Sequence, residues 1–398
     1  MLKALLIARR EESAWCLPRI LYKSGFSIDA ITSTPIIHSN CYLNQSTFVP
    51  TNVSIIPTIN YHINNKKYDW VIVTDDECLV EIYTSQLSIE DKLTLLPVTE
   101  KKHLKHIYSK IDLSLILAAN GIQTPPFAIA YDLNSALQGA NKIGYPVLVK
   151  IDASSGGFGI FECKSTEELI ALDLPIFKWV IHDQQKQPLL KKTLRLPPLL
   201  KDTDFTKQNH FHFAEAARGL AAPVLIQKKI AGIELDTSAI FIKKQLIHFS
   251  YSEVKKATHR FGPSLVRAYR QLTTADTALQ NELQNLGNAL GADGILTIGC
   301  IDANDGSGRY YFEADMRPNA WLEYSHFVGD SLIKKIKKWF TENKTIPLNK
   351  QYSVYYPRTR IMPYFLRLTV REILLNKYHV WRFIPPGGMK MLKIKLSQ

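Results

Sequence analysis

The sequence predicts an α/β fold that becomes α+β in its later part, and two observations carry this prediction. Near the start, apolar strand-like runs alternate with an amphipathic helical segment, as in βαβ units. From residue 223 onward, strand-like runs follow one another with one helix between them. With 398 residues, two or three domains are expected, and the chain is long enough to bury a sizeable core.

Composition places the chain among soluble globular proteins, with 46% apolar and 10% aromatic residues. The five cysteines are scattered, odd in number and without C-x-x-C spacing, which favours a reducing cytoplasm over a disulfide framework or a zinc site. The first apolar run, Ala4–Ala8, is too short for a signal-peptide core. We expect no membrane-spanning helix, because no stretch of about 18 apolar residues is present.

The net charge of +13 belongs to one end of the chain. Residues 331–398 contain 15 lysines and arginines but only 2 acidic residues, whereas basic and acidic residues balance in the other 330. Any argument about an acidic partner must therefore be made for residues 331–398.

Residues 1–105 read as a βαβ unit. Leu2–Ala8 and Ile28–Ile31 are predicted strands, with a helix over Ser13–Lys23 between them. Asp69–Thr74 is the clearest strand, and it runs directly into Asp75–Glu77. Acidic residues in this place can border a ligand site of an α/β sheet, or they can begin a solvated helix. Both interpretations stay open.

Residues 106–140 read as two helices separated by Thr124–Pro126. The next run, Pro146–Val149, is a short buried strand that ends in Lys150, and the loop Ser154–Gly159 follows. Glycines let backbone N–H groups approach a ligand, and a lysine supplies a point charge, so this combination suits a polyphosphate. No G-x-x-x-x-G-K-[ST] motif is present, and the alternative is a glycine-rich turn beside a half-buried lysine.

The part from residue 165 to residue 330 begins with a helix over Ser165–Ala171. Residues 173–222 lack any sustained period and read as an insertion. Patterned segments then return: strands over Pro223–Gln227, Leu235–Ile242, Gln245–Tyr251 and Ile295–Ile301, and a helix over Ala275–Leu290.

Three carboxylates follow two of the later strand-like runs. Asp302 ends one run, and alternation places Glu313 and Asp315 on one face of the next. Converging carboxylates repel one another unless a cation neutralises them, and hard oxygen ligands suit Mg²⁺. A solvated strand edge is the alternative, but it does not account for the neighbouring Arg317 and the apolar setting.

Basic residues concentrate in Ser252–Arg270, part of which reads as an exposed helix. Arginine binds carboxylates and phosphates bidentately, so we expect Arg260 to contact a transferring phosphate or a substrate.

Four segments in register resemble the ATP-grasp superfamily over roughly residues 107–330. They are Ser109–Asp112, the Lys150 strand with its glycine loop, Val224–Glu234, and Tyr311–Asn319. The resemblance implies a Rossmann-like domain over 1–105, a lid subdomain over 106–222 that includes the insertion, and a second α+β subdomain over 223–330. A basic helical segment over 331–398 would follow, with an amphipathic helix near Met362–Leu375.

The resemblance also implies roles for single residues around ATP and Mg²⁺. Lys110 and Lys150 match two phosphate-binding lysines, and Glu234 resembles the acid that accepts from the ribose hydroxyls. The other implied nucleotide-binding residues are Ser154, Ser155, Gly156 and Gly157 in the loop, and Gln227, Lys228 and Ile230 in the adenine-binding segment. Asp302, Glu313 and Asp315 would hold the metal, and Arg317 and Lys150, together with the Arg260 expected from the basic run, would act on the transferring phosphate.

The last motif departs from the family pattern Glu-x-Asn-Pro-Arg. Glu313 and Arg317 match it, whereas Asp315 stands where asparagine is usual and Met316 where proline is common. The activity expected from the resemblance is that of a carboxylate–amine ligase that forms an acyl phosphate from ATP. An ATP-binding protein without catalysis is the alternative, because Asp315 adds a negative charge.

The basic segment raises a separate question about partners. Its lysines and arginines, interleaved with aromatic residues, suit peripheral contact with an anionic membrane or an acidic polymer. A helical flank that packs on the core is the alternative, and no nucleic-acid-binding motif is present. We expect small carboxylates and amines as substrates, a cytoplasmic protein that can be peripheral at the membrane, and compatibility with a homodimer.

Overall fold

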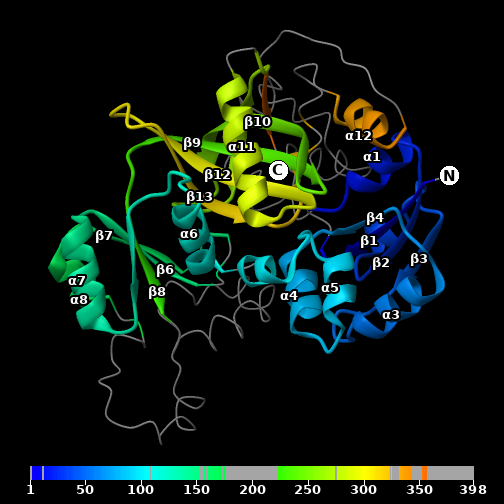
Figure 1. Ribbon diagram of the computed structural model, residues 1–398, viewed down its shortest axis with the longest axis horizontal. Coiled ribbons are helices and arrows are strands. Elements are labelled where there is room, and N and C mark those ends of the chain that lie inside the picture. Colours follow the sequence, from blue (N-terminus) through cyan, green and yellow to red (C-terminus); the bar gives the residue numbers. More distant parts are fainter. Residues whose placement is uncertain are drawn as a thin grey trace, which may run out of the picture.

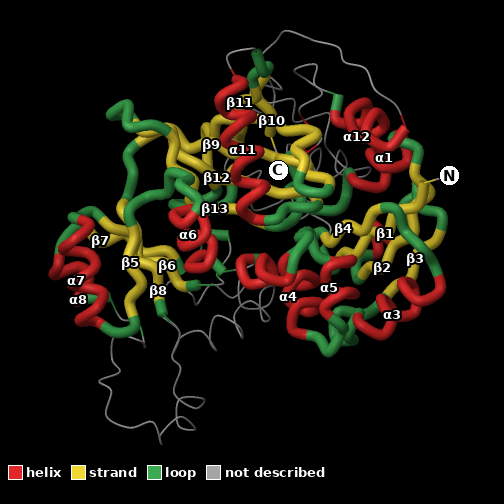
Figure 2. The backbone as a smooth tube through the Cα atoms, viewed as in Figure 1, coloured by secondary structure: helices red, strands yellow, loops and turns green. Residues whose placement is uncertain are grey.

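Three β-sheets organise the described part of the chain (Figures 1 and 2). The computed structural model describes residues 2–10, 13–107, 109–152, 154, 156–157, 159–172, 174, 223–273, 276–322, 324, 331–341 and 352–355. The predicted insertion at 173–222, apart from Leu174, lies outside these residues, as do Ser155 and the predicted amphipathic helix at 362–375.

The first sheet is parallel and has the strand order β3-β2-β1-β4. Its strands are β1 (Leu2–Ala8), β2 (Phe26–Thr32), β3 (Gln45–Phe48) and β4 (Trp70–Val73). The helices of this region are α1 (Leu17–Lys23), α2 (Pro35–His38), α3 (Ile56–Asn65), α4 (Asp76–Thr84) and α5 (Ile89–Leu95). This order, with every pair parallel, is that of the first half of a doubly wound sheet, and it brings the carboxyl end of β4 to one edge.

The second sheet is small and antiparallel, with the order β5-β8-β6-β7. Its strands are β5 (Phe127–Ala130), β6 (Val147–Ile151), β7 (Ile160–Cys163) and β8 (Val224–Lys228). Helices α7 (Leu133–Ile143) and α8 (Thr166–Ile170) lie beside it at the end of the molecule far from the first sheet (Figure 1). We call this sheet with its two helices the lid.

The third sheet is the largest and has the order β13-β12-β9-β10-β11-β14, with every pair antiparallel. Its strands are β9 (Gly232–Ile242), β10 (Gln245–Ala257), β11 (Ser264–Tyr269), β12 (Gly294–Ala303), β13 (Arg309–Asp315) and β14 (Tyr352–Tyr355). The chain thus passes from the lid to this sheet at residues 229–231. Helix α11 (Thr277–Leu290) lies in front of the sheet in Figure 1.

Three elements connect or flank the sheets. A 3-10 helix (Lys101–His106) leads into α6 (Lys110–Ala119), which lies between the lid and the third sheet (Figure 1). Helix α12 (Leu332–Thr341) packs beside α1, with the Phe340 ring 4.9 Å from that of Phe26 and 5.8 Å from that of Trp70. This part of the basic segment therefore forms a flank of the folded molecule. None of the described helices is long and apolar enough to cross a membrane.

The apolar interior is divided into separate clusters of buried side chains. One cluster joins the first sheet to the third through residues such as Leu5, Val73, Phe241 and Leu296. The lid has a separate cluster of its own, which includes Val147, Val149 and Ile226 together with alanines of α7. The lid is thus packed as an independent unit beside a joint body of the other two sheets.

The predicted segments form regular elements close to their expected bounds, but several short strands were not foreseen. β3, β5, β7 and β11 each contain only four to six residues, and β7 and β11 emerge directly from glycine- or proline-containing loops. The prediction of an exposed helix within Ser252–Arg270 is wrong: these residues form the end of β10, a turn, and β11. Half of β11 is valine, leucine and tyrosine, which is a strand composition.

Candidate functional site

A polar face of the third sheet forms the floor of the site. Alternation along β9 places Glu234, Asp236 and Ser238 on this face, while Leu235, Ala239 and Phe241 enter the apolar core on the other. The pairing aligns two rows across β9, β12 and β13: Asp236–Gly299–Glu313, and Ser238–Thr297–Asp315. Gly299 has no side chain, so β12 places no side chain between Asp236 and Glu313 in that row.

Two lysines come to this floor from different elements. Lys150, on β6, is only 3% exposed, and its ammonium lies 5.1 Å from the centre of the Phe312 ring. Burial lowers the pKa of Lys150 to about 8, with the Glu313 carboxylate acting in the opposite direction and Lys110 adding to the decrease. The Lys110 ammonium, at the start of α6, donates to the carbonyl of Ser154. The structure therefore brings both lysines together with Glu313, as expected.

Asp152 connects the two elements that carry these lysines. It lies two residues after Lys150, and its carboxylate accepts from Ser109 Oγ at 2.9 Å and from the backbone N–H of Ile111 at 3.1 Å. Ser109 in turn caps α6 by accepting from the N–H of Asp112. The end of β6 thereby fixes the first turn of α6, and with it Lys110.

The glycine loop lies against the turn between β10 and β11. Gly156 and Gly157 have φ of +66° and +79°, in the left-handed region that favours glycine. A Cβ atom on Gly157 would lie 1.9 Å from the carbonyl oxygen of Phe261, so no larger residue fits there in this arrangement. Ser154 Oγ donates to the Ile151 carbonyl at 2.8 Å, which closes the turn after β6.

The acidic end of the floor is tied to the N-terminal region. Arg317 donates from Nε to Asp76 at 2.6 Å, and its Nη2 lies 2.9 Å from Asp315. Burial raises the pKa of Asp315, and Glu313 and Asp76 raise it further, whereas Arg317 acts in the opposite direction. Asp76, which begins α4, thus reaches the site from the first sheet and forms one side of it.

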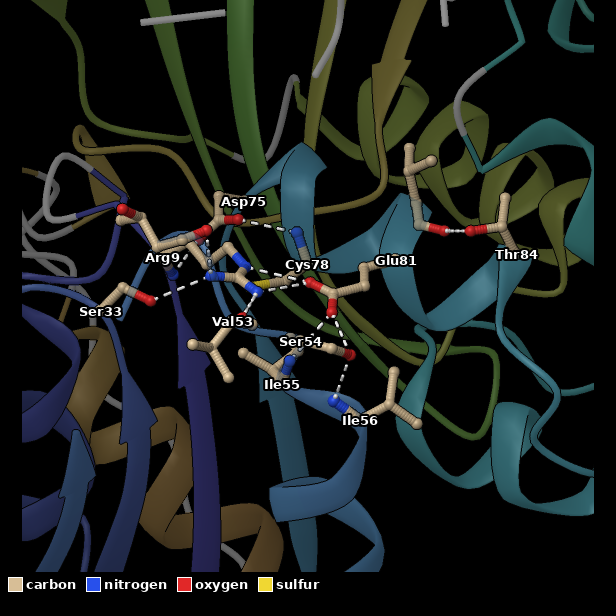
Figure 3. A network of polar contacts seen from close by, with 12 residues as sticks. Arg9, Ser33, Val53, Ser54, Ile55, Ile56, Asp75, Cys78, Glu81 and Thr84 are labelled. Atoms are coloured by element: carbon tan, nitrogen blue, oxygen red, sulfur yellow. Dashed lines mark hydrogen bonds and ion pairs between the residues drawn. The ribbon is translucent and has the colours of Figure 1, made fainter. Parts of the chain in front are cut away.

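The neighbours of Asp76 have structural roles, which Figure 3 shows for Asp75. The Asp75 carboxylate caps α4 at the N–H of Cys78 and also accepts from the backbone N–H of Arg9 at 2.8 Å. The Arg9 guanidinium bonds Glu81, Ser33 and two backbone carbonyls. Of the two earlier interpretations of Asp75–Glu77, the helix start holds for Asp75, although this residue is buried rather than solvated, while Asp76 pairs with Arg317.

Asp302 does not join the other two predicted metal ligands. β12 pairs regularly with β9, and Asp302 is opposite Ile233, on the face of Leu235 rather than that of Asp236. Its carboxylate lies 2.8 Å from Nε of Arg309. Within the described residues, no group of three His, Cys, Asp or Glu side chains has the arrangement of a metal site. Glu313 and Asp315 remain as the pair of carboxylates on the floor.

Arg260 also lies away from the floor. Its guanidinium pairs with Glu162 on β7, a residue that Lys229 approaches at 2.8 Å, and 61% of the Arg260 side chain is exposed. The strand Ser264–Tyr269 instead carries Arg267 to the floor, where it pairs with Asp236 and is 4% exposed. The turn that contains Arg260 therefore links the third sheet to the lid.

The predicted adenine-binding segment connects the lid to the floor. Gln227 is buried, and its Nε2 atom has no hydrogen-bond partner among the described residues. Lys228 donates to the carbonyls of Gly144 and Tyr145 at 2.8 and 2.9 Å, and Ile230 follows in the connection to β9. Glu234 lies at the rim of the floor, where desolvation and, to a smaller extent, neighbouring Asp236 and Glu313 raise its pKa to about 7.

Sequence reasoning missed Asp152 and Asp236, left Asp76 open between two interpretations, and did not single out Arg267 within the basic run. Two of them had a usable signal, because Asp152 and Asp236 each stand two residues after a predicted site residue on a strand, and thus on the same face. Asp76 and Arg267 reach the site only through the packing of distant segments, which spacing along the sequence does not reveal.

The chain has the ATP-grasp fold. It resembles the biotin carboxylase domain of 2-oxoglutarate carboxylase from Hydrogenobacter thermophilus, there a dimer with MgADP, ADP and bicarbonate. The TM-score is 0.62 at 17% identity, covering 89% of this chain and 74% of that one.

Two ligases have similar structures. L-amino acid ligase from Bacillus licheniformis has a TM-score of 0.57 at 15% identity, covering 89% of this chain and 79% of that one. Phosphoribosylglycinamide synthetase from Anaerococcus prevotii has a TM-score of 0.57 at 13% identity, covering 89% and 81%. No protein-family model and no curated protein sequence matches the chain. The similarity to these proteins is therefore one of fold.

Proposed function

We propose that this protein is an ATP- and magnesium-dependent ligase that activates a carboxylate as an acyl phosphate and joins it to an amine. The observation that carries the proposal is the Lys150 ammonium. It is buried over the Phe312 ring, and it lies close enough to the Glu313 carboxylate and to the charge of Lys110 for both to act on its pKa. A second cation beside a buried cation is costly unless an anion binds between them, and a polyphosphate is such an anion.

The carboxylates of the floor fit a magnesium ion. Glu313 makes no hydrogen bond or ion pair within the described residues, and Asp315 stands on the same face one row away. Proteins hold Mg²⁺ by one or two carboxylates together with phosphate oxygens and water, so Glu313 and Asp315 would suffice. When bound, the ion neutralises charge on the terminal phosphates.

The remaining nucleotide contacts follow from the connection between the lid and the floor. Backbone groups at Lys228 and Ile230, with the buried Gln227 amide, would bind adenine, and Glu234 at the rim would accept from the ribose. Ser154, Ser155, Gly156 and Gly157 would donate backbone N–H groups to the phosphates. Support for these roles is that β8, which carries Gln227 and Lys228, pairs with β6, which carries Lys150, and that the charge of Glu234 acts on Lys150.

The reaction has two steps. A carboxylate oxygen bonds to the γ-phosphorus as the bond from that phosphorus to ADP breaks, while Lys150, Lys110 and Arg317 stabilise the charge. An amine nitrogen then attacks the carbonyl carbon, phosphate leaves with the shared oxygen, and the amine loses a proton to solvent. The glycine loop and the lid would exclude water from the acyl phosphate.

Release of ADP in the presence of Mg²⁺ and mixed carboxylates and amines tests this function. Lys150→Met and Glu313→Gln should each reduce turnover by roughly 100-fold or more. Lys142→Met, an exposed change on α7 of the lid, should leave it unchanged. Wild-type turnover that survives both site changes would contradict the proposal.

A second candidate is a nucleotide-binding protein without ligase activity. Two observations favour it: Asp302 is turned away from the floor, and Asp315 is already neutralised by Arg317. Such a protein would bind MgADP in a way that depends on Lys150 but would release no ADP with any carboxylate and amine. Isothermal titration with MgADP, run beside the turnover assay, distinguishes the two.

A further inference from the structure

Two buried donors without partners lie in one corner of the floor. Nη1 of Arg267 and Nδ2 of Asn319 have no hydrogen-bond partner among the described residues, and the two residues are 4% and 8% exposed. An unpaired buried donor costs free energy comparable to a lost hydrogen bond, so each such group calls for an acceptor. Neither has one among the residues that the structure describes.

The Arg267 guanidinium is fixed on three sides. It pairs with Asp236, its Nε donates to Ser264 Oγ at 2.7 Å, and its plane lies 4.7 Å from the centre of the Trp321 ring. The guanidinium is therefore held rigidly, and its Nη1 donor remains without a partner among the described residues. Since Asp236 neutralises its charge, hydrogen bonding rather than net charge would attract a ligand here.

The orientation of the Asn319 amide is determined by its neighbours. Its Oδ1 accepts from the backbone N–H of Trp321 at 3.0 Å and from Ser238 Oγ at 2.9 Å. A backbone N–H can only donate, so the atom that faces it must be the oxygen. The other atom, Nδ2, is consequently a free donor.

These two donors belong to one corner beside the acidic end of the floor. Asp236 and Ser238, which hold them, are successive residues on one face of β9, about 7 Å apart, and Trp321 contacts both Arg267 and Asn319. Glu313 and Asp315 stand two strands away in the same two rows, roughly 10 Å across the sheet. A phosphoryl group and a small acyl group fit within that span.

We infer that Arg267 and Asn319 form the subsite that holds the carboxylate of the substrate. This inference rests on the proposed function and names the residues that select its acid. The two donors bind one carboxylate oxygen, which leaves the other oxygen free to attack the γ-phosphorus. Arg260, which the sequence had pointed to for this task, pairs with the lid instead.

Asn319→Asp tests the subsite with little change in shape. The new carboxylate keeps the acceptor for Ser238 and Trp321 but replaces the free donor with an oxygen that repels a carboxylate. We expect the KM for the acid to rise roughly 10- to 100-fold, with the KM for ATP unchanged. Arg267→Lys keeps the pair with Asp236 but loses the planar fork, and a rise of similar size is expected.

Matched controls carry the same chemical changes elsewhere. Asn285→Asp is an exposed change on α11, and Arg270→Lys alters an arginine that pairs with Asp276 and stacks on Tyr251. Both should leave the KM for the acid as in the wild type. Equal effects of Arg267→Lys and Arg270→Lys would mean that Arg267 has a merely structural role.

Thermal unfolding provides a readout that does not depend on turnover. The probes are bicarbonate, acetate, succinate, glycine and L-glutamate, with inorganic phosphate as a separate arm, each added to protein saturated with MgADP. At least one carboxylate should raise the Tm of the wild type, and Asn319→Asp should abolish that rise while keeping the protection by MgADP itself.

The outcomes that would contradict the subsite can be distinguished from the one that would also contradict the proposed function. Protection by MgADP without any response to the carboxylates, or a carboxylate response that Asn319→Asp leaves intact, overturns the subsite alone. Protection by phosphate that exceeds every carboxylate, and that Asn319→Asp abolishes, assigns the donors to phosphate and also overturns it. Absence of MgADP protection in the wild type overturns the proposed function together with this inference.

Discussion

At the scale of single residues, Lys150 is kept at a cost to stability. Its pKa is about 8 in the folded protein and 10.5 in the unfolded chain. Below pH 8 both states hold the proton and the folded state carries the full penalty. Between pH 8 and 10.5 only the unfolded chain keeps the proton, so the free energy of unfolding rises with pH.

Lys150→Met should therefore stabilise the ligand-free protein at pH 7, by roughly 2–3 kcal/mol, because methionine fills the space without a buried charge. The same change should abolish MgADP binding. Urea unfolding at pH 7 and pH 9.5 measures both parts of the prediction, since the wild type should gain stability between these values through Lys150 and the variant should not. A variant less stable than the wild type at pH 7 would contradict this account.

Asp152 is a second residue whose substitution changes the position of α6 without removing a group that acts in the reaction. Asp152→Ala removes two hydrogen bonds that fix the first turn of α6, one of them to a backbone N–H. We expect a loss of roughly 1–2 kcal/mol in the free energy of unfolding and a higher KM for ATP, because Lys110 is no longer held in place. Urea unfolding and steady-state kinetics measure the two effects, and an unchanged KM for ATP would show that α6 keeps its position without Asp152.

At the scale of elements, the glycine loop and the β10–β11 turn fit together at Gly157. Gly157→Ala places a methyl group against the Phe261 carbonyl and also forces a left-handed φ, so the loop cannot take this position. Turnover should fall at least tenfold, by analogy with other misplaced catalytic loops, while the circular dichroism spectrum is retained.

Gly121→Ala is the control for that prediction. Gly121 has φ of +67°, nearly that of Gly157, but a Cβ atom there meets nothing within 4 Å. Gly121→Ala therefore introduces backbone strain similar to that of Gly157→Ala, but no steric clash. If both variants lose activity equally, the contact between the loop and the turn is not what matters.

Elements also show what the sequence could and could not predict. Long patterned strands such as β9 and β12, and helix α11, were predictable because alternation and helical periodicity persist over ten residues or more. Short strands were missed since β5 and β7 contain four residues each, too few to show a period. The face on which Asp302 lies follows from its register against β9, and register is a tertiary property.

At the scale of the whole molecule, the N-terminal region completes the site through Asp76. This aspartate comes from α4, 241 residues before the arginine that it binds. Asp76→Asn should reduce kcat by roughly tenfold with little change in the KM for ATP, because Arg317 loses a charged partner that orients it.

Glu90→Gln is a suitable control for that change, because it removes a charge from the first turn of the neighbouring helix α5 without reaching Arg317. Steady-state kinetics of Asp76→Asn and Glu90→Gln, each compared with the wild type, test whether Asp76 raises kcat. An Asp76→Asn protein with wild-type kcat would show that Asp315 alone orients Arg317.

Only part of the floor was predictable, because its two lysines and Glu313 belong to local motifs, whereas Asp302 and Arg260 lie elsewhere. Arg267 was not predictable, since its place on the floor depends on where the turn after β10 ends. A sequence motif shows which residues a strand contains, whereas the pairing of the strands determines which of those residues lie close together.

The separate apolar interior of the lid has a consequence for motion. A layer with its own packing can tilt about the short connection at residues 229–231 without opening the body below it. The ion pair between Arg260 and Glu162 is one contact that such a tilt would break. Amide exchange in β5 to β8 should accordingly slow on nucleotide binding, while exchange in β1 and β2 stays as it was.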